Sequence, residues 1–383
     1  MLTSRKLSAA AAATVAASLT LAAGSAGAKP LFGSHDIHGP AGAVFVQSDD
    51  LTGNTITVYA RKRDGTLSPA GTYATGGNGD QLVGSVVDHL ASQDSLVYDA
   101  AQRELFAVNA GSNTVSVFTV DGTHLRLRQV VGSGGTFPAS IAVHGDLVYV
   151  LNALNDGAIQ GYRLINGDLS PIAGSWRPLG LVPDSTTPQF VSTPGDIAFT
   201  PDGANLLVTT KATDNEILVF PVDASGLPAA APVVNNEPGA VPFAIAFEGG
   251  DQVAIGEAGP NAVASFDLLA DGTLAPLSIA DTGGAATCWL VADGPVLFAG
   301  NAASHTESSV LDSPSGTLTL AATTSTDAGT VDATTSRDGR YLYVQTGGSG
   351  IVDEFWVGSG GSLAEIGSVT VPNAVGGEGI AAS

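Results

Sequence analysis

The residues best suited to acid–base chemistry are few, because charged residues make up only 13% of this 383-residue chain. Asp196, Lys211, Glu257 and His305 stand at the ends of short β-rich segments and form the candidate catalytic set. Carboxylate, amine and imidazole groups exchange protons near neutral pH when burial shifts their pKa values. The alternatives are an ion pair between neighbouring segments and, for His305, an exposed turn residue without a chemical role.

A second set of polar residues occupies similar positions and forms the candidate ligand-binding set. It consists of Asp94, Asn109, Asn152, Cys288, Asn301 and Asp332. Carboxylate and amide oxygens around a narrow opening would suit a divalent cation such as calcium. The alternative is that Asn and Asp cap turns by bonding their own backbone. We therefore predict no cofactor and assign no metal site, and calcium remains the one alternative.

Cys288 and two histidines complete the residues that chemistry could use. Cys288 follows a small-residue turn beside Trp289, and a nucleophilic thiol would need a nearby cation or helix N-terminus. We expect it to be a buried core residue. His35 and His38 could hold a metal, but no cysteine completes a ligand set, so an unstructured leader is the favoured interpretation.

These residues are positioned by a unit that repeats seven times, with strand ends spaced roughly 43 to 61 residues apart. The second strand of each unit ends at Ser48, Asn109, Asn152, Thr210, Glu257, Asn301 and Thr346. About ten residues later comes a mostly aromatic position, occupied by Tyr59, Phe118, Tyr162, Phe220, Phe266, Val310 and Phe355. A turn glycine follows, at Gly65, Gly122, Gly167, Gly226, Gly272, Gly316 and Gly361.

The repeat predicts an all-β fold, a seven-bladed β-propeller of four-stranded blades in a single domain over residues 42–383. The first unit lacks an inner strand, whereas the chain ends in an unused one near Ile380. We expect the C-terminal strand to join blade 1 and close the ring. Insertions at 76–94 and 176–194 should emerge on the ligand face, either as surface loops or as a partial lid with Trp176 or Phe190 as an apolar contact.

The N-terminus indicates export. Arg5 and Lys6 precede an alanine-rich apolar segment, and small residues end at Ala28, so residues 1–28 are predicted to be a cleaved signal peptide and 29–41 a leader. The expected location is extracellular. The formal net charge of −22 disfavours nucleic acid and anionic membranes as partners, and no apolar segment predicts membrane insertion. We expect a monomer that meets a small molecule or glycan on its central face.

The segment Ala107–Phe118, AVNAGSNTVSVF, resembles the repeat of the lactonase-type seven-bladed propellers, which include 6-phosphogluconolactonases and carboxymuconate cyclases. The resemblance covers the whole chain after the signal, and Ala286–Trp289 suggests a secreted bacterial branch. Active members place a Pro-His pair where this chain has Pro138 and Ala139, and arginines where it has Asp196 and Ala244. No catalytic residue is therefore transferred from the family.

Two functions remain open at this stage. The resemblance implies a hydrolase or cycloisomerase acting on a lactone or organic acid. The unmatched histidine and arginines favour the alternative, a non-catalytic extracellular propeller that binds a small molecule, glycan or protein partner. A propeller supports either function, so the arrangement of the site must decide between them.

Overall fold

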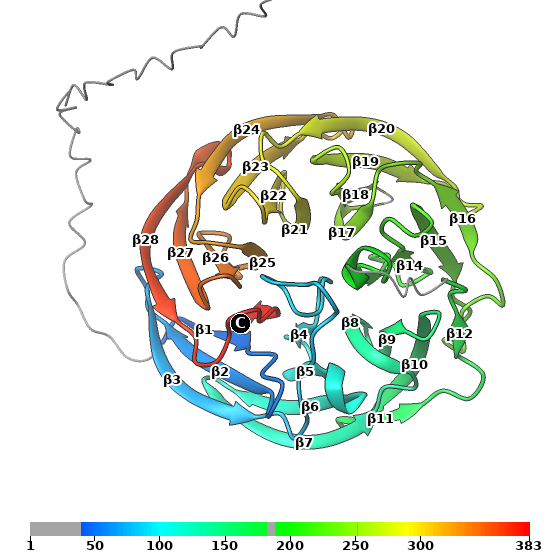
Figure 1. The fold of residues 1–383 in the computed structure, drawn as a ribbon, viewed down its shortest axis with the longest axis horizontal. Coiled ribbons are helices and arrows are strands. Elements are labelled where there is room, and N and C mark those ends of the chain that lie inside the picture. The colour runs from blue at the N-terminus through cyan, green and yellow to red at the C-terminus, as the bar shows by residue number, and fades with distance from the viewer. Residues whose placement is uncertain (1–39, 182–187, 251) are drawn as a thin grey trace, which may run out of the picture. The chain divides into compact units, whose positions relative to one another are not determined.

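The described part of the chain, residues 40–181, 188–250 and 252–383 of a computed structural model, is a ring of antiparallel sheets (Figure 1). The expected signal peptide at 1–28 lies outside these residues, as does the leader up to residue 39, with His35 and His38. Each of seven sheets forms one blade. The predicted seven-bladed β-propeller is confirmed.

The first four blades contain these strands, from the axis outward. Blade 1 has β29 (Ile380–Ala382), β1 (Gly42–Gln47), β2 (Thr55–Arg61) and β3 (Leu67–Ala74). Blade 2 has β4 (Leu96–Asp99), β5 (Glu104–Asn109), β6 (Thr114–Asp121) and β7 (His124–Gly132). Blade 3 has β8 (Thr136–His144), β9 (Leu147–Leu154), β10 (Ala158–Ile165) and β11 (Asp168–Pro171), with β12 (Arg177–Pro178) also on β10. Blade 4 has β13 (Ile197–Phe199), β14 (Asn205–Thr209), β15 (Glu216–Pro221) and β16 (Val233–Asn236).

The remaining blades follow the same order. Blade 5 has β17 (Pro242–Gly249), β18 (Gln252–Glu257), β19 (Ala262–Leu268) and β20 (Leu274–Asp281). Blade 6 has β21 (Thr287–Asp293), β22 (Val296–Asn301), β23 (Thr306–Asp312) and β24 (Leu318–Ser325). Blade 7 has β25 (Thr330–Thr335), β26 (Tyr341–Thr346), β27 (Ile351–Val357) and β28 (Leu363–Thr370). Three 3-10 turns are η1 (Ala110–Ser112), η2 (Gln189–Val191) and η3 (Ser359–Gly361).

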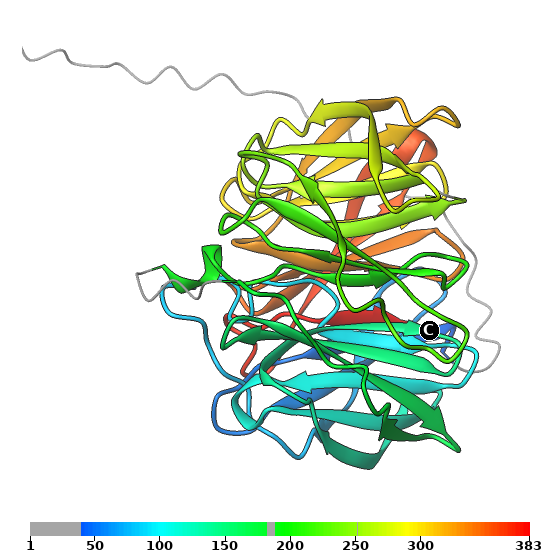
Figure 2. The same ribbon diagram turned by 90° about the vertical axis from the view of Figure 1, so that its right-hand side faces the viewer.

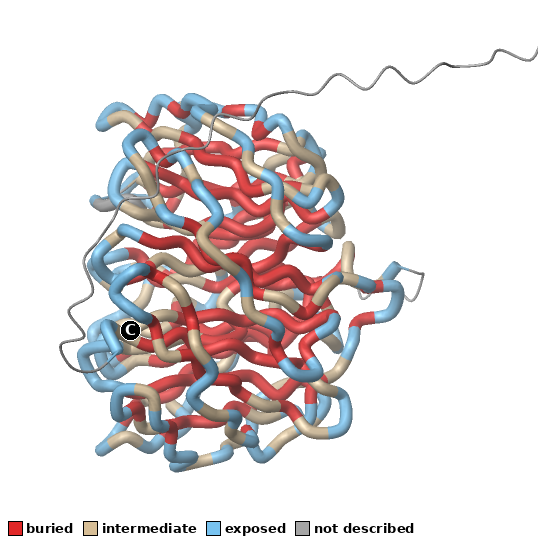
Figure 3. The backbone as a smooth tube through the Cα atoms, turned by 90° about the vertical axis from the view of Figure 1, so that its left-hand side faces the viewer, coloured by how far each residue is buried: buried red, intermediate tan, exposed pale blue. Residues whose placement is uncertain are grey.

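The features that repeat in the sequence occupy equivalent places in the blades. All seven turn glycines predicted from the repeat have positive φ, between 60° and 87°, which a side chain would strain. The seven residues of the mostly aromatic position are each at most 2% exposed. They lie in hydrophobic clusters that join neighbouring blades, as Phe118 of blade 2 packs with Phe45 of blade 1. Figure 3 shows this burial running through the strands, with exposure concentrated at the hairpins.

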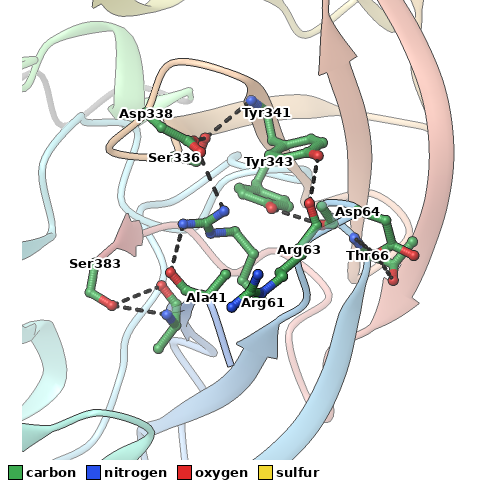
Figure 4. A network of polar contacts seen from close by, with 12 residues as sticks. Ala41, Arg61, Arg63, Asp64, Thr66, Ser336, Asp338, Tyr341, Tyr343 and Ser383 are labelled. Carbon is green, nitrogen blue, oxygen red and sulfur yellow. Dashed lines mark hydrogen bonds and ion pairs between the residues drawn. The ribbon is translucent and has the colours of Figure 1, made fainter. Parts of the chain in front are cut away.

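The ring closes as predicted, through the last residues of the chain. β29 pairs with β1 in an antiparallel register that places Phe45 opposite Ala381. Figure 4 shows polar contacts near this closure, some of which join blade 1 to blade 7. The Arg61 guanidinium donates a 2.9 Å hydrogen bond to the Ala41 carbonyl and lies 3.9 Å from Asp338. Tyr341 donates its hydroxyl to the carbonyl of Arg63 at 2.9 Å.

The two insertions lie on the same face of the propeller and contact each other. The first, between β3 and β4, turns inward to the axis, where it is drawn in cyan in Figure 1. The second carries η2 and projects from the same face, in green in Figure 2. The Gln189 backbone amide donates to the Val83 carbonyl at 2.7 Å, and its side chain accepts from the Val83 amide.

No helix in the described ranges is long and apolar enough to cross a membrane.

Candidate functional site

The central feature of the ligand face is a loop that closes this end of the central channel. We call residues 82–94 the axial plug. Its turn is formed by Asp88, whose carboxylate accepts from the backbone amides of Leu90 and Ala91 at 3.0 and 2.8 Å. Leu90 is fully buried, whereas Val83 and Val86 on the outer side are 56% and 76% exposed. The first insertion therefore packs against the blades on its inner side and exposes apolar residues on its outer side. The interpretation as a simple surface loop is wrong.

The axial plug is bonded to blades on all sides of the axis. The Ser92 carbonyl accepts from the Trp289 indole of blade 6 at 2.7 Å, and the Ser92 hydroxyl donates to the Ala139 carbonyl of blade 3 at 2.9 Å. The Gln93 amide donates to the Gly195 carbonyl of blade 4 at 3.0 Å. These partners are largely backbone groups. The plug therefore satisfies polar atoms that would otherwise be buried at the axis without hydrogen bonds.

Further contacts tie the plug to blades 1 and 7. The His89 amide donates to the Gly376 carbonyl at 2.7 Å. A β-carbon at Gly347 of blade 7 would lie 1.7 Å from the Val87 carbonyl oxygen, so only glycine allows this approach. Together with blades 3, 4 and 6, these contacts cover most of the ring.

Three carboxyl groups are enclosed at the plug: Asp88 of the plug itself, Asp49 and Glu378. Asp88 and Glu378 share a hydrogen bond, and Glu378 also accepts from the Ser92 backbone amide at 3.2 Å. Burial and the neighbouring Asp88 raise the pKa of Glu378 well above its ordinary value. Burial also raises the pKa of Asp49 to about 7. Two oxygens can share a hydrogen bond only if one carries a proton, so this cluster holds at least one proton in the folded state.

Lys211 interacts electrostatically with Asp88 and Glu378 of this cluster. Its ammonium donates to the Ala91 carbonyl at 2.5 Å and to the Thr193 hydroxyl at 3.0 Å, and it lies over the Phe243 ring. Burial lowers the pKa of Lys211 to about 8, although Asp88 acts in the opposite direction. Lys211 thus fastens the two insertions to blade 4. Its predicted catalytic role stays a prediction.

Cys288 is a buried free cysteine of the blade 5–6 core, where Phe243 and Trp289 also pack. Burial raises the pKa of its thiol to about 12, and Asp88 acts in the same direction. The thiol is therefore neutral, which opposes a nucleophilic role.

Asp196 connects three blades at the start of β13. Its carboxylate accepts from the Ser140 hydroxyl of blade 3 at 3.0 Å, from its own neighbour Ile197, and from the Ile245 amide of blade 5 at 2.9 Å. Burial and the nearby Asp94 raise the pKa of Asp196 well above its ordinary value.

The other two members of the candidate catalytic set lie apart from Lys211 and Asp196. Glu257, at the end of β18, is 4% exposed, and burial next to Glu237 raises its pKa to about 7. His305 lies in the β22–β23 turn, where its Nδ1 accepts from the Gly329 amide at 2.8 Å. No hydrogen bond or ion pair of the described residues joins any two of the four. Their shared catalytic role stays a prediction.

The three candidate asparagines hold the turns of their own blades. Asn109 donates to the Ser116 hydroxyl at 2.8 Å, and Asn152 donates to the Ser133 carbonyl at 3.1 Å. Asn301 donates to the Ser308 hydroxyl at 2.8 Å. All three are fully buried, and their role in binding a ligand stays a prediction.

The channel stays hollow beyond the plug. A cavity of about 310 Å³ extends from Gln93 and Asp94 along the inner strands β4, β17, β21, β25 and β29. Asp332 and Thr334 of β25 also line it, together with apolar residues of the inner strands. The candidate residues Asp94 and Asp332 thus belong to one space, which opens away from the face where sequence reasoning placed the ligand.

The described residues contain no group of three or more His, Cys, Asp or Glu side chains arranged to hold a metal ion. The calcium alternative stays a prediction.

Sequence reasoning missed Asp88, Ser92 and Gln93. These residues fall in an insertion without strand periodicity, and most of their partners are backbone carbonyls and amides that leave no mark in the residue types.

Comparison with known proteins places this architecture. No family model matches the chain, and no curated protein matches it by sequence. Solved structures match at 19% identity: a proposed 6-phosphogluconolactonase from Bacteroides uniformis (TM-score 0.71, covering 89% of this chain and 99% of that one) and the periplasmic gluconolactonase of Pseudomonas aeruginosa (0.70, 89% and 98%). This chain has the fold of the lactonase-type seven-bladed propellers. The predicted resemblance to those propellers is confirmed at the level of fold.

Within that lactonase-type fold, a protein from Lactobacillus plantarum is equally similar, with a TM-score of 0.71 and 19% identity over 89% of this chain and 99% of that one. At this identity the likeness concerns the fold and not the chemistry.

Proposed function

We propose that this protein is a non-catalytic binding propeller that takes a small organic molecule into the open half of its central channel. The observation that carries the proposal is the axial plug, which occupies the ligand face and bonds to blades around the axis. Each buried hydrogen bond contributes about 1 kcal/mol net, so opening the face would break several such bonds together. Lys211, Asp88 and Glu378 are thereby kept from solvent and from any substrate.

The retained cavity supports binding at the opposite end. Its volume of about 310 Å³ reaches the lower end of the roughly 300–1,000 Å³ typical of small-ligand sites. It also combines an apolar wall with two carboxyl groups, which is the usual composition of such sites. We propose that the protein acts outside the cell, because the sequence before Ala28 has the pattern of an export signal.

Hydrolysis of a lactone is the competing proposal, supported by the fold shared with the Pseudomonas aeruginosa gluconolactonase. A screen of sugar and aliphatic lactones distinguishes the two. We expect no hydrolysis above the spontaneous rate. Hydrolysis that Glu257→Gln or Lys211→Met abolishes would overturn the binding proposal in favour of an enzyme.

A ligand screen by thermal shift tests binding directly. Ala246 is 7% exposed, belongs to the core between blades 5 and 6 and lines the cavity, so Ala246→Phe should displace its neighbours into the space and abolish every positive result, while the unfolding midpoint in urea reports whether the fold is kept. Val86→Ser, on the exposed side of the plug, is the matched control and should leave them unchanged. Hits that survive Ala246→Phe but disappear with Val86→Ser would place binding on the plug face and contradict the proposal.

A further inference from the structure

The closed end of the cavity carries a carboxyl group with no partner of its own. No described residue donates a hydrogen bond to the Asp94 carboxylate, although the Asp94 carbonyl accepts from the Ile141 amide at 2.9 Å. The backbone of Asp94 has φ 59°, a left-handed conformation that few residues other than glycine, Asn and Asp adopt. The structure thus holds an unpaired acid at the bottom of an open space.

Asp332 lies on the same space and has spare capacity. Its two oxygens accept from the Ala333 amide at 2.9 Å and the Ile380 amide at 3.2 Å. A carboxylate oxygen has two lone pairs, so each can accept one more donor. Burial and Asp94 raise the pKa of Asp332 well above its ordinary value, so Asp332, like Asp94, must lose a proton to hold a cation as a carboxylate.

The ionisable groups around the closed end are carboxyl groups. No Lys, Arg or His lines the cavity. The acids that interact electrostatically with Asp94 or Asp332 are Asp88, Asp196, Glu307 and Glu378. Lys211 acts on Asp88 and Glu378 beneath the plug. Arg103 and Arg337 act on Tyr98, at the far end of β4. The interior therefore favours a cation over an anion.

The side of the cavity includes partly exposed apolar residues that could contact a hydrocarbon body. These are Phe247 and Val291, with the Tyr98 ring toward the mouth, whereas Ile245 and Leu290 are each 3% exposed and belong to the cores between blades. Burying apolar surface contributes roughly 25 cal/mol per Å², so a hydrocarbon group adds affinity that a bare ion would lack.

We propose that this cavity binds a primary ammonium compound with an apolar body, an inference that rests on the binding function proposed above. The ammonium group has three N–H donors, which can reach the unpaired Asp94 oxygens and the free lone pairs of Asp332. Bonds between ammonium and carboxylate are charge-assisted and stronger than neutral ones. The apolar body then lies along Phe247 and Val291 toward the mouth.

Isothermal titration with phenethylamine and its neutral analogue phenethyl alcohol tests this assignment. We expect the amine to bind and the alcohol to bind at least tenfold more weakly. Asp94→Asn should weaken amine binding at least tenfold, and Asp332→Asn should weaken it as well. Asp99→Asn, at the outer end of the same strand, is the matched control and should change the affinity less than twofold.

The variant at position 94 should fold, because Asn adopts the left-handed conformation readily. An unfolding midpoint in urea equal to that of the wild type verifies this. A lost affinity with an unchanged midpoint then reports the missing charge and not a damaged fold.

A proton balance gives an independent readout. Burial raises the pKa of Asp94 to about 7, so binding a cation near neutral pH must ionise the carboxyl and release its proton to the buffer. The affinity should rise between pH 6 and pH 8. Titrations in buffers with different ionisation enthalpies should report proton release, which Asp94→Asn should abolish.

The outcomes separate the two proposals. Equal binding of amine and alcohol, unchanged in Asp94→Asn, overturns the ammonium assignment but leaves a binding propeller. Calcium binding that requires Asp94, without amine binding, overturns it in favour of a metal site. If neither probe binds, the ammonium assignment is overturned, and the ligand screen with Ala246→Phe decides the wider proposal separately.

Discussion

The two ends of the central channel are built from the same seven inner strands but differ in how their polar groups are satisfied. On the outer side of the plug, Ser92 and Lys211 have hydrogen-bond partners within the protein, contributed by the blades and by both insertions. On the cavity side of the plug, the Asp94 carboxylate has none among the described residues. The blade repeat therefore specifies the ring, whereas one irregular insertion determines which end of the axis can receive a molecule.

Removing the main side-chain anchor of the plug should have the largest effect. Trp289 is 3% exposed, packs against Phe243 and donates to the Ser92 carbonyl. Trp289→Ala should lower the free energy of unfolding by about 3–5 kcal/mol, measured by urea denaturation. Trp356→Ala, at a side chain 45% exposed, should change it by less than about 0.5 kcal/mol. Similar losses in both variants would contradict the role assigned to the plug.

Lys211→Met should loosen the plug without emptying the core. The substitution keeps the apolar stem but leaves the Ala91 carbonyl without its donor, at a cost of about 1–3 kcal/mol. Hydrogen exchange should accelerate at the backbone amides of His89 and Gln93, which belong to the plug. Lys62→Met, at an exposed position, should leave exchange unchanged. Unaltered exchange in Lys211→Met would show that Lys211 does not hold the plug.

The plugged end should also make stability depend on pH. The pKa of Asp49 is raised from 3.8 to about 7, so the folded protein binds a proton that the unfolded chain releases. That contribution is complete below about pH 4 and is lost as pH rises to about 7. Unfolding measured from pH 4 to pH 8 should show stability falling across this window.

Asp49→Asn should reduce this pH dependence by about 4 kcal/mol over the window. The Gln47 side-chain oxygen is unpaired and can accept from the new amide after a flip. The variant should therefore exceed the wild type in stability at pH 8. An unchanged slope would assign the titration to other carboxyl groups.

The smallest effect should come from the rim of the open end. Tyr98 lines the cavity, and none of the described hydrogen bonds involves its hydroxyl. Tyr98→Phe should alter the free energy of unfolding by less than about 0.5 kcal/mol in urea. A loss above 1 kcal/mol would mean that the open end is as tightly organised as the plugged end.

The fold was predictable because a propeller repeats its rules. Gly226 and Phe220 stand at positions that have an equivalent in each blade. The lone strand near Ile380 matches the strand missing from blade 1. The site was less predictable. The position of Lys211 beside a turn was clear from the sequence, but its partner is the carbonyl of Ala91 in an insertion without periodicity. Any residue supplies a carbonyl, so the sequence carried no signal for that contact.

The closure of the ring has a consequence for how the chain can be cut and joined. The Ser383 amide donates to the Ala43 carbonyl, and the Ala43 amide donates to the Ser383 hydroxyl, both at 2.9 Å. The two ends of the propeller are thus neighbours, and a short linker could fuse them. A circular permutant opened at the exposed β23–β24 hairpin would hold all four strands of blade 1 on one continuous stretch of chain. Blade 6 would then become the blade that must be completed from both ends.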